Sequence, residues 1–159
     1  MNAYGFHTIH GRAAFTFLTG LYLLYWLSIT VNIGIVLGAV MATFMAANVW
    51  FVIWPNQKKV IAGAPDAADA GAKAGLASRT NTLFSLPMLY LMVYSAHGGA
   101  LPMIAESSMN SLWIGLVVIL LIEANALFGK MNAMITSVKA VIHSGVALTV
   151  IFGLLVHYL

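Results

Sequence analysis

The sequence predicts an all-α integral membrane protein, a single domain (1–159) built as a bundle of about five transmembrane helices. Composition is the first reason: 62% of the 159 residues are apolar and only 7% are charged, whereas about 25% of an average soluble domain is charged. The second reason is that residues 13–54 contain no charged side chain, and one spanning helix needs only about 20 residues. These observations exclude a soluble globular enzyme, a nucleic-acid-binding module and a disordered chain.

The uncharged segment is long enough for two helices, which we expect at about 7–28 and 31–54. Their break falls at residues 28–32, the most polar stretch inside the segment. The second helix is predicted to leave the bilayer at Trp54 and Pro55, because an interfacial aromatic residue, a helix breaker and then two lysines follow one another.

Small residues recur every fourth position along this second helix. They are Gly34, Gly38, Ala42 and Ala46. Small side chains at this spacing let two helix backbones approach closely inside a bilayer. The stripe therefore predicts an ordinary helix–helix contact.

An Ala/Gly-rich connector at residues 60–79 follows the second helix. Asp69 and Lys73 are spaced i,i+4 and would suit a short surface helix. We nevertheless expect an inter-helix loop here.

The remaining three helices are expected at about 80–97, 109–128 and 135–158. The first of them contains Pro87, which a spanning helix tolerates when its neighbours bond the freed carbonyl. Glycines follow both of the first two helices, and the last helix runs to the end of the chain.

The basic residues set the predicted orientation. With the N-terminus in the cytoplasm and the C-terminus outside, every Lys and Arg falls on the cytoplasmic side of the five helices. They are Arg12, Lys58, Lys59, Lys73, Arg79, Lys130 and Lys139. This distribution is the positive-inside pattern of a multi-pass protein of the bacterial inner (cytoplasmic) membrane.

Two segments on either side of the connector resemble a known family. Residues 45–59, MAANVWFVIWPNQKK, and residues 79–88, RTNTLFSLPM, look like linked motifs of the membrane domain of bacterial urate hydroxylases, the "urate oxidase N-terminal" family. The resemblance covers about residues 31–132. His97 falls where the family helix ends in an Asn-His pair, and Asn32 stands where the family tends to carry a His.

The resemblance implies association with membrane redox chemistry. The family proteins have roughly twice as many spanning helices and a C-terminal cytochrome c domain, so this chain is expected to be a minimal relative. Covalent haem c needs cysteines, and the chain has none.

Histidines at the predicted helix ends are candidate ligands for haem iron. They are His7, His10, His97, His143 and His157. His143 and His157 lie on one side of the last helix, within about 40° of each other and about 21 Å apart along its axis. The topology puts His7 and His10 at the depth of His143, and His97 at the depth of His157. Bis-histidine haem b would use such pairs, with His10 and His143 as the preferred one and Gly153 leaving room for a flat ring. Histidines at helix ends are also common as interfacial groups.

Other polar residues lie within the predicted helices. Glu123 is expected to be protonated, paired with a buried partner or part of a proton path. Equally, it would extend toward Lys130 or bond to Asn48 or Asn81 on neighbouring helices. Arg79 and Asn81 begin the third helix, where anchoring to lipid phosphate and helix capping are favoured over substrate contact.

Three functional readings follow. In the first, the chain is a haem-b-binding electron-transfer or accessory subunit of a membrane redox complex, embedded in the lipid bilayer among other membrane subunits. In the second, it is a cofactor-free structural subunit of a larger membrane assembly. In the third, it is a urate-oxidising membrane component that works with a separate cytochrome. No nucleic acid partner is expected.

Overall fold

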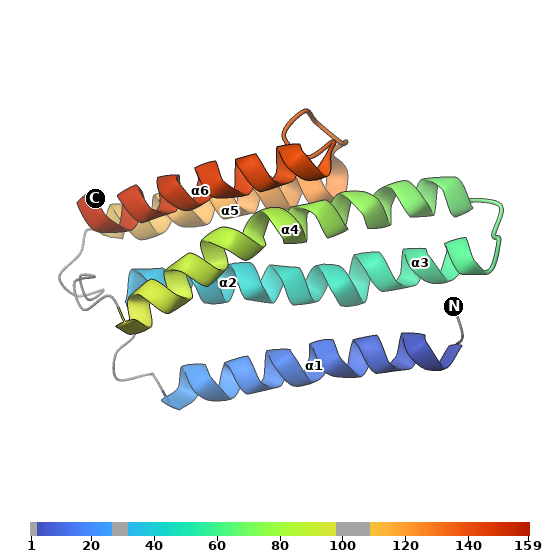
Figure 1. The fold of residues 1–159 in the computed structure, drawn as a ribbon, viewed down its shortest axis with the longest axis horizontal. Coiled ribbons are helices and arrows are strands. Elements are labelled where there is room, and N and C mark those ends of the chain that lie inside the picture. Colours follow the sequence, from blue (N-terminus) through green and yellow to red (C-terminus); the bar gives the residue numbers. More distant parts are fainter. Residues whose placement is uncertain (1–2, 27–31, 98–108) are drawn as a thin grey trace.

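The computed structural model of the protein describes residues 3–26, 32–97 and 109–159. Every regular element in these ranges is a helix, in agreement with the predicted all-α class (Figure 1). In chain order they are α1 (Ala3–Trp26), α2 (Ile33–Ala47), η2 (Asn48–Ile53), α3 (Trp54–Ile61), α4 (Ala67–His97), α5 (Met109–Phe128) and α6 (Val138–Tyr158).

Three of the described helical segments are long and apolar enough to cross a membrane. They are Ile33–Ile61, Met109–Phe128 and Val138–Tyr158. The outward-facing positions of α5 and α6 carry large apolar side chains such as Leu121 and Ile151, which are more than half exposed. An apolar exterior of this kind suits a lipid environment.

α2 begins directly after the polar stretch of residues 28–32. α1 ends at Trp26 and α2 begins at Ile33. Asn32 caps α2: its Oδ1 accepts a hydrogen bond from the backbone N–H of Ile35 at 3.0 Å. Such a cap satisfies one of the free amides at a helix start.

The second helix does not end at Trp54, as the sequence predicted, but continues to Ile61. α2, η2 and α3 follow one another without a break. η2 is a π-helix, and the N–H of Trp54 donates to the carbonyl of Val49, five residues back. Pro55 then occupies the first turn of α3, where its missing N–H is tolerated. The change of hydrogen-bond register in η2, just before Pro55, thus allows the helix to continue beyond the proline.

The predicted loop at residues 60–79 is also wrong for most of its length, since α4 already begins at Ala67. Ala70, Ala74 and Ala77 are buried, and α3 packs along this first part of α4. Small side chains allow this close packing, and the tertiary contact with α3 stabilises the helix in an Ala/Gly-rich stretch.

A tight turn joins α3 to α4. Gly63 adopts a positive φ of 63°, a conformation that glycine reaches without steric cost. Lys59 and Asp66 pair across the turn with 2.7 Å between Nζ and Oδ2. The hydrogen bond from Lys59 lowers the pKa of the exposed Asp66 carboxyl below its usual value.

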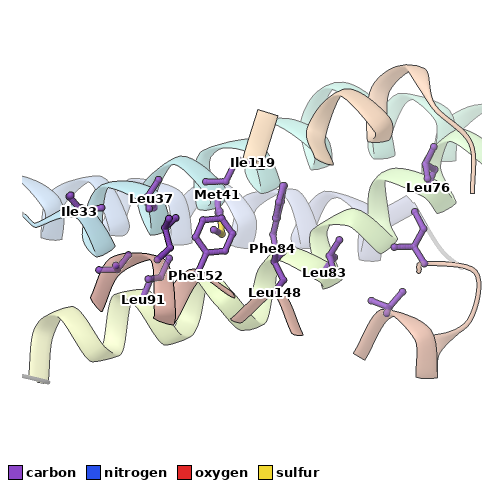
Figure 2. Packing of buried hydrophobic residues seen from close by; sticks show 14 residues of the cluster. Ile33, Leu37, Met41, Leu76, Leu83, Phe84, Leu91, Ile119, Leu148 and Phe152 are labelled. Carbon is purple, nitrogen blue, oxygen red and sulfur yellow. The ribbon is translucent and has the colours of Figure 1, made fainter. Parts of the chain in front are cut away.

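The core lies where α2, α4, α5 and α6 meet, and α4 packs against each of the other three. Figure 2 shows the apolar side chains that fill it. The largest fully buried ones include Leu37, Met41, Phe84, Ile119 and Phe152. α1 packs mainly on α2 and lies apart from the rest of the bundle (Figure 1).

Glycines permit the closest helix contacts in this core. A Cβ placed on Gly38 would lie 3.1 Å from Met92 Cγ and 3.6 Å from the carbonyl oxygen of Met88. The small-residue stripe of α2 therefore makes a close contact with α4 at Gly38. At Gly115 of α5, an added Cβ would lie 2.8 Å from Leu37 Cδ1.

Candidate functional site

A buried polar cluster joins three helices in the interior of the bundle. It consists of Asn48, Asn81 and Glu123, from η2, α4 and α5. Asn48 Nδ2 donates to Asn81 Oδ1 at 3.0 Å and to Glu123 Oε2 at 3.1 Å. Asn81 Nδ2 donates to the carbonyl oxygen of Met45 at 2.9 Å. The side chains are 1% exposed at Asn48 and 4% exposed at Glu123, so this polar cluster is shielded from the surroundings.

The π-helix orients the donor at the centre of the cluster. Asn48 is the first residue of η2, directly after the α-helical register of α2 ends. Its amide group uses both hydrogens, one for each neighbouring helix. π-turns inside α-helices occur frequently at functional sites, and here the turn begins at the residue that connects the two other members.

Glu123 has a neutral amide, not a cation, as its hydrogen-bond partner. Asn48 is bonded to one carboxyl oxygen, and within the described ranges no hydrogen bond reaches the other oxygen. The ion pair that the structure describes is Lys59–Asp66, at the α3–α4 turn. The sequence offers extension toward Lys130 as one alternative for the Glu123 side chain, but Lys130 is exposed and Glu123 is buried. A carboxyl group whose hydrogen-bond partner is a neutral amide can hold a proton or accept hydrogen bonds.

Arg79 is not brought into the polar cluster. It lies half-buried on α4 two positions before Asn81, and no hydrogen bond joins these described residues to each other. Asn81 itself lies well inside α4 and contacts η2 and α2, so it does not cap the start of a helix as predicted.

Asn81 also lines a cavity of about 320 Å³ between α1, α2 and α4. The remaining walls are almost entirely apolar, with Phe17 and Gly20 from α1, Ala42 and Ala46 from α2, and Met88 from α4. The cavity thus places one amide group of the polar cluster beside an apolar space.

The histidines predicted as haem ligands at the cytoplasmic end come from helices that do not lie side by side. α1, which carries His7 and His10, and α6, which carries His143, lie on opposite sides of the bundle (Figure 1). His143 is exposed, and its Nδ1 lies 2.7 Å from the carbonyl oxygen of Lys139 on the same helix. The side chains of His7 and His10 lie outside the described residues.

At the opposite end of α6, His157 is exposed and packs edge-on against Tyr158, with ring centroids 4.7 Å apart. His97 is the last residue of α4, and its side chain is also outside the described part of the chain. Among the side chains that are described, no three of His, Asp and Glu form a group able to hold a metal ion.

Tyr90 packs against Gly153. A Cβ placed there would lie 3.2 Å from the Tyr90 ring, and Tyr90 stacks on Tyr94 with centroids 5.4 Å apart. Gly153 therefore accommodates the phenol ring of Tyr90, and both residues line a cavity of about 340 Å³ together with His157. The period-four spacing of Tyr90 and Tyr94 on one helix predicts their stacking, but nothing local in the sequence joins them to Gly153.

These features define a helical bundle of the membrane-protein type, with apolar exteriors on its long helices and a polar cluster in its interior. The chain belongs to the urate oxidase N-terminal family, whose family model matches residues 16–156. This match extends the predicted resemblance into α1 and α6 and includes all three residues of the polar cluster. No curated protein and no solved structure matches the chain.

Proposed function

We propose that this protein is a membrane subunit of a redox complex and that its polar cluster holds a proton inside the bilayer. The observation that carries the proposal is Glu123, a carboxyl group 4% exposed within a long apolar helix. Ionisable groups in such positions are costly and are retained where they act on ions or protons. Family membership supports the association with redox chemistry.

The arrangement of the cluster suits reversible protonation. Asn48 binds Oε2 of Glu123 and fixes the plane of the carboxyl group, and the other oxygen is left to receive the proton. Asn81 in turn holds Asn48 in place. Oxidation or reduction of a cofactor in a partner subunit changes the local charge, and a proton taken up or released at Glu123 compensates that change.

The proposed orientation has all five helices crossing the bacterial inner membrane, with the N-terminus inside and the C-terminus outside. In support, the start of α1, the α3–α4 turn and the α5–α6 connection lie at the same end of the bundle (Figure 1). The seven basic residues of the chain lie in or near these segments, as the positive-inside rule requires of a cytoplasmic end.

Infrared difference spectroscopy of the purified protein in lipid nanodiscs tests the proton site. The chain has only four acidic residues, so the carbonyl band of a protonated carboxylic acid can be assigned by substitution. We expect a band that shifts in D₂O, is absent in Glu123→Gln and remains in Asp69→Asn, an exposed control. Identical spectra for Glu123→Gln and the wild type across the neutral pH range would refute the proposal.

Haem b ligated by His143 is a second candidate function, supported by the geometry of one side chain. With Nδ1 bonded to the Lys139 carbonyl, the Nε2 atom is left as the ligand atom, the arrangement usual for metal-binding histidines. α1 and α6 lie on opposite sides of the bundle (Figure 1), so the proposed second ligand of His143 is a residue of another subunit. A pyridine haemochrome spectrum tests this reading, which fails if no Soret band appears or if His143→Ala leaves the band unchanged.

The family also supports a role as a urate-oxidising component that works with a separate cytochrome. Membranes containing both proteins would then consume oxygen when urate is added. Asn81→Leu would abolish this uptake and Thr82→Ala, its exposed neighbour, would retain it. Equal uptake in membranes that lack the chain contradicts the reading.

A further inference from the structure

We infer that the cavity between α1, α2 and α4 binds a membrane-soluble quinone, with a ring carbonyl hydrogen-bonded to Asn81. The ligand class rests on the proposed redox function, whereas the existence of the site rests on the cavity itself. Its volume of about 320 Å³ is at the lower end of the range of small-molecule pockets, about 300–1,000 Å³. Like those pockets, it combines apolar walls with very few polar groups.

Small residues and one aromatic contact create the cavity. The α2 wall is formed largely by Ala42 and Ala46, and Gly20 faces it from α1. At one end Phe17 of α1 meets Trp50 of η2 edge-on, with ring centroids 5.8 Å apart. Because these two large rings fill the gap at that end, α1 is kept away from the small residues of α2, and the space between them stays open.

Asn81, the amide side chain in the cavity wall, offers a hydrogen-bond donor. Asn81 Nδ2 carries two hydrogens, and one of them is bonded to the carbonyl oxygen of Met45. Its Oδ1 accepts from Asn48, so the group left for a ligand is an N–H. This donor selects an apolar molecule that carries a hydrogen-bond acceptor. A quinone ring has two carbonyl acceptors, whereas a lipid acyl chain has none.

The cavity is placed for entry from the bilayer. α1 packs mainly on α2, and outward-facing side chains of α1 such as Leu18 and Tyr22 are more than half exposed. A hydrophobic ligand can therefore reach the cavity past the edge of α1 without crossing water. Once bound, the ligand lies next to Asn81, and Asn48 links Asn81 to Glu123 by hydrogen bonds.

Gly20 gives a sharp test, because it lines the cavity and a Cβ added there meets nothing within 4 Å. Gly20→Leu should fill the space while leaving the fold intact. Gly11 is the matched control: it is on the same helix, an added Cβ there also meets nothing within 4 Å, and it does not line the cavity. Gly11→Leu should bind ligand as the wild type does.

The measurement is quenching of tryptophan fluorescence by decylubiquinone in nanodiscs, with Trp50 next to the cavity as the reporter. We expect saturable quenching that is lost in Gly20→Leu and retained in Gly11→Leu. Asn81→Leu should weaken binding about tenfold, the size of one lost hydrogen bond. Decylbenzene, which has the same tail but no carbonyl, should fail to compete.

Three outcomes would overturn the inference: no saturable quenching, equal binding by both glycine variants, or full competition by decylbenzene, which would identify a site for acyl chains. The proposed proton site is tested independently of the quinone site. Quinone binding that depends on Gly20 would stand even if the infrared band of Glu123 were absent, and the reverse also holds.

Discussion

Replacing Asn48 with Leu removes the central donor of the polar cluster and tests whether the cluster stabilises the bundle. Two hydrogen bonds disappear, to Asn81 Oδ1 and to Glu123 Oε2. Side-chain hydrogen bonds between membrane helices contribute about 0.6 kcal/mol on average and about 1.7 kcal/mol at most. We therefore expect Asn48→Leu to lower the free energy of unfolding by about 1–3 kcal/mol. The upper part of this range reflects the burial of an unbonded carboxyl group.

Reversible unfolding in mixed detergent and SDS micelles, followed by tryptophan fluorescence, measures this change. Thr82→Ala is the control, because Thr82 is exposed beside Asn81 and its hydroxyl donates to the Ser78 carbonyl of its own helix. Its effect should stay within about 0.5 kcal/mol. A double-mutant cycle with Glu123→Leu should give a coupling energy of about 1 kcal/mol, since removing both partners leaves no unbonded group. An effect of Asn48→Leu no larger than that of Thr82→Ala, or zero coupling, would refute the reasoning.

Three further predictions concern other parts of the molecule. Gly115→Val should lower the free energy of unfolding by about 1–3 kcal/mol in the same assay, because an added Cβ would lie 2.8 Å from Leu37 Cδ1; unchanged stability would contradict the packing. The hydrogen bond from Lys59 lowers the pKa of Asp66, so the ion pair contributes above the ordinary aspartate value and is lost as pH falls through the lowered pKa. In an NMR titration, Lys59→Met should raise the Asp66 midpoint toward the ordinary aspartate value, and an unmoved midpoint would be inconsistent with the pair. Because the chain has no cysteine, Ala64→Cys introduces a single thiol that reports the orientation of the α3–α4 turn. In intact cells this thiol should not react with an impermeant maleimide, and it should react after permeabilisation. Labelling in intact cells would contradict the proposed topology.

The parts of the fold that the sequence predicted are those controlled by composition and by local capping. The uncharged run predicted two helices, and Asn32, the last residue of the polar stretch at residues 28–32, caps the second of them, α2. The predicted range of the fourth helix, 109–128, coincides with α5. The pairing of Glu123 with an asparagine was one of the predicted alternatives, because polar groups in an apolar interior can bond only to one another.

The parts that could not be predicted depend on contacts between distant segments. The stretch from Ala67 onward is helical because α3 packs on its alanines, and no local pattern records that contact. The π-turn at Asn48 and the passage of the helix through Pro55 depend on the register of hydrogen bonds, which composition does not encode. Gly153 packs against Tyr90, a residue from another helix.

The unequal lengths of the helices have a mechanical consequence. α4 has 31 residues and is therefore about 46 Å long, while the hydrocarbon core of a bilayer is about 30 Å thick. With the membrane placed as proposed, α3 and the first turns of α4 project into the cytoplasm as a stiff, two-helix lever. Asn48 and Asn81 lie further along the same two helical segments, η2 and α4, and uninterrupted helix joins each of them to the tip of the lever. A twist applied to the tip by a soluble protein would thus be transmitted along the helical backbone to the carboxyl group of Glu123.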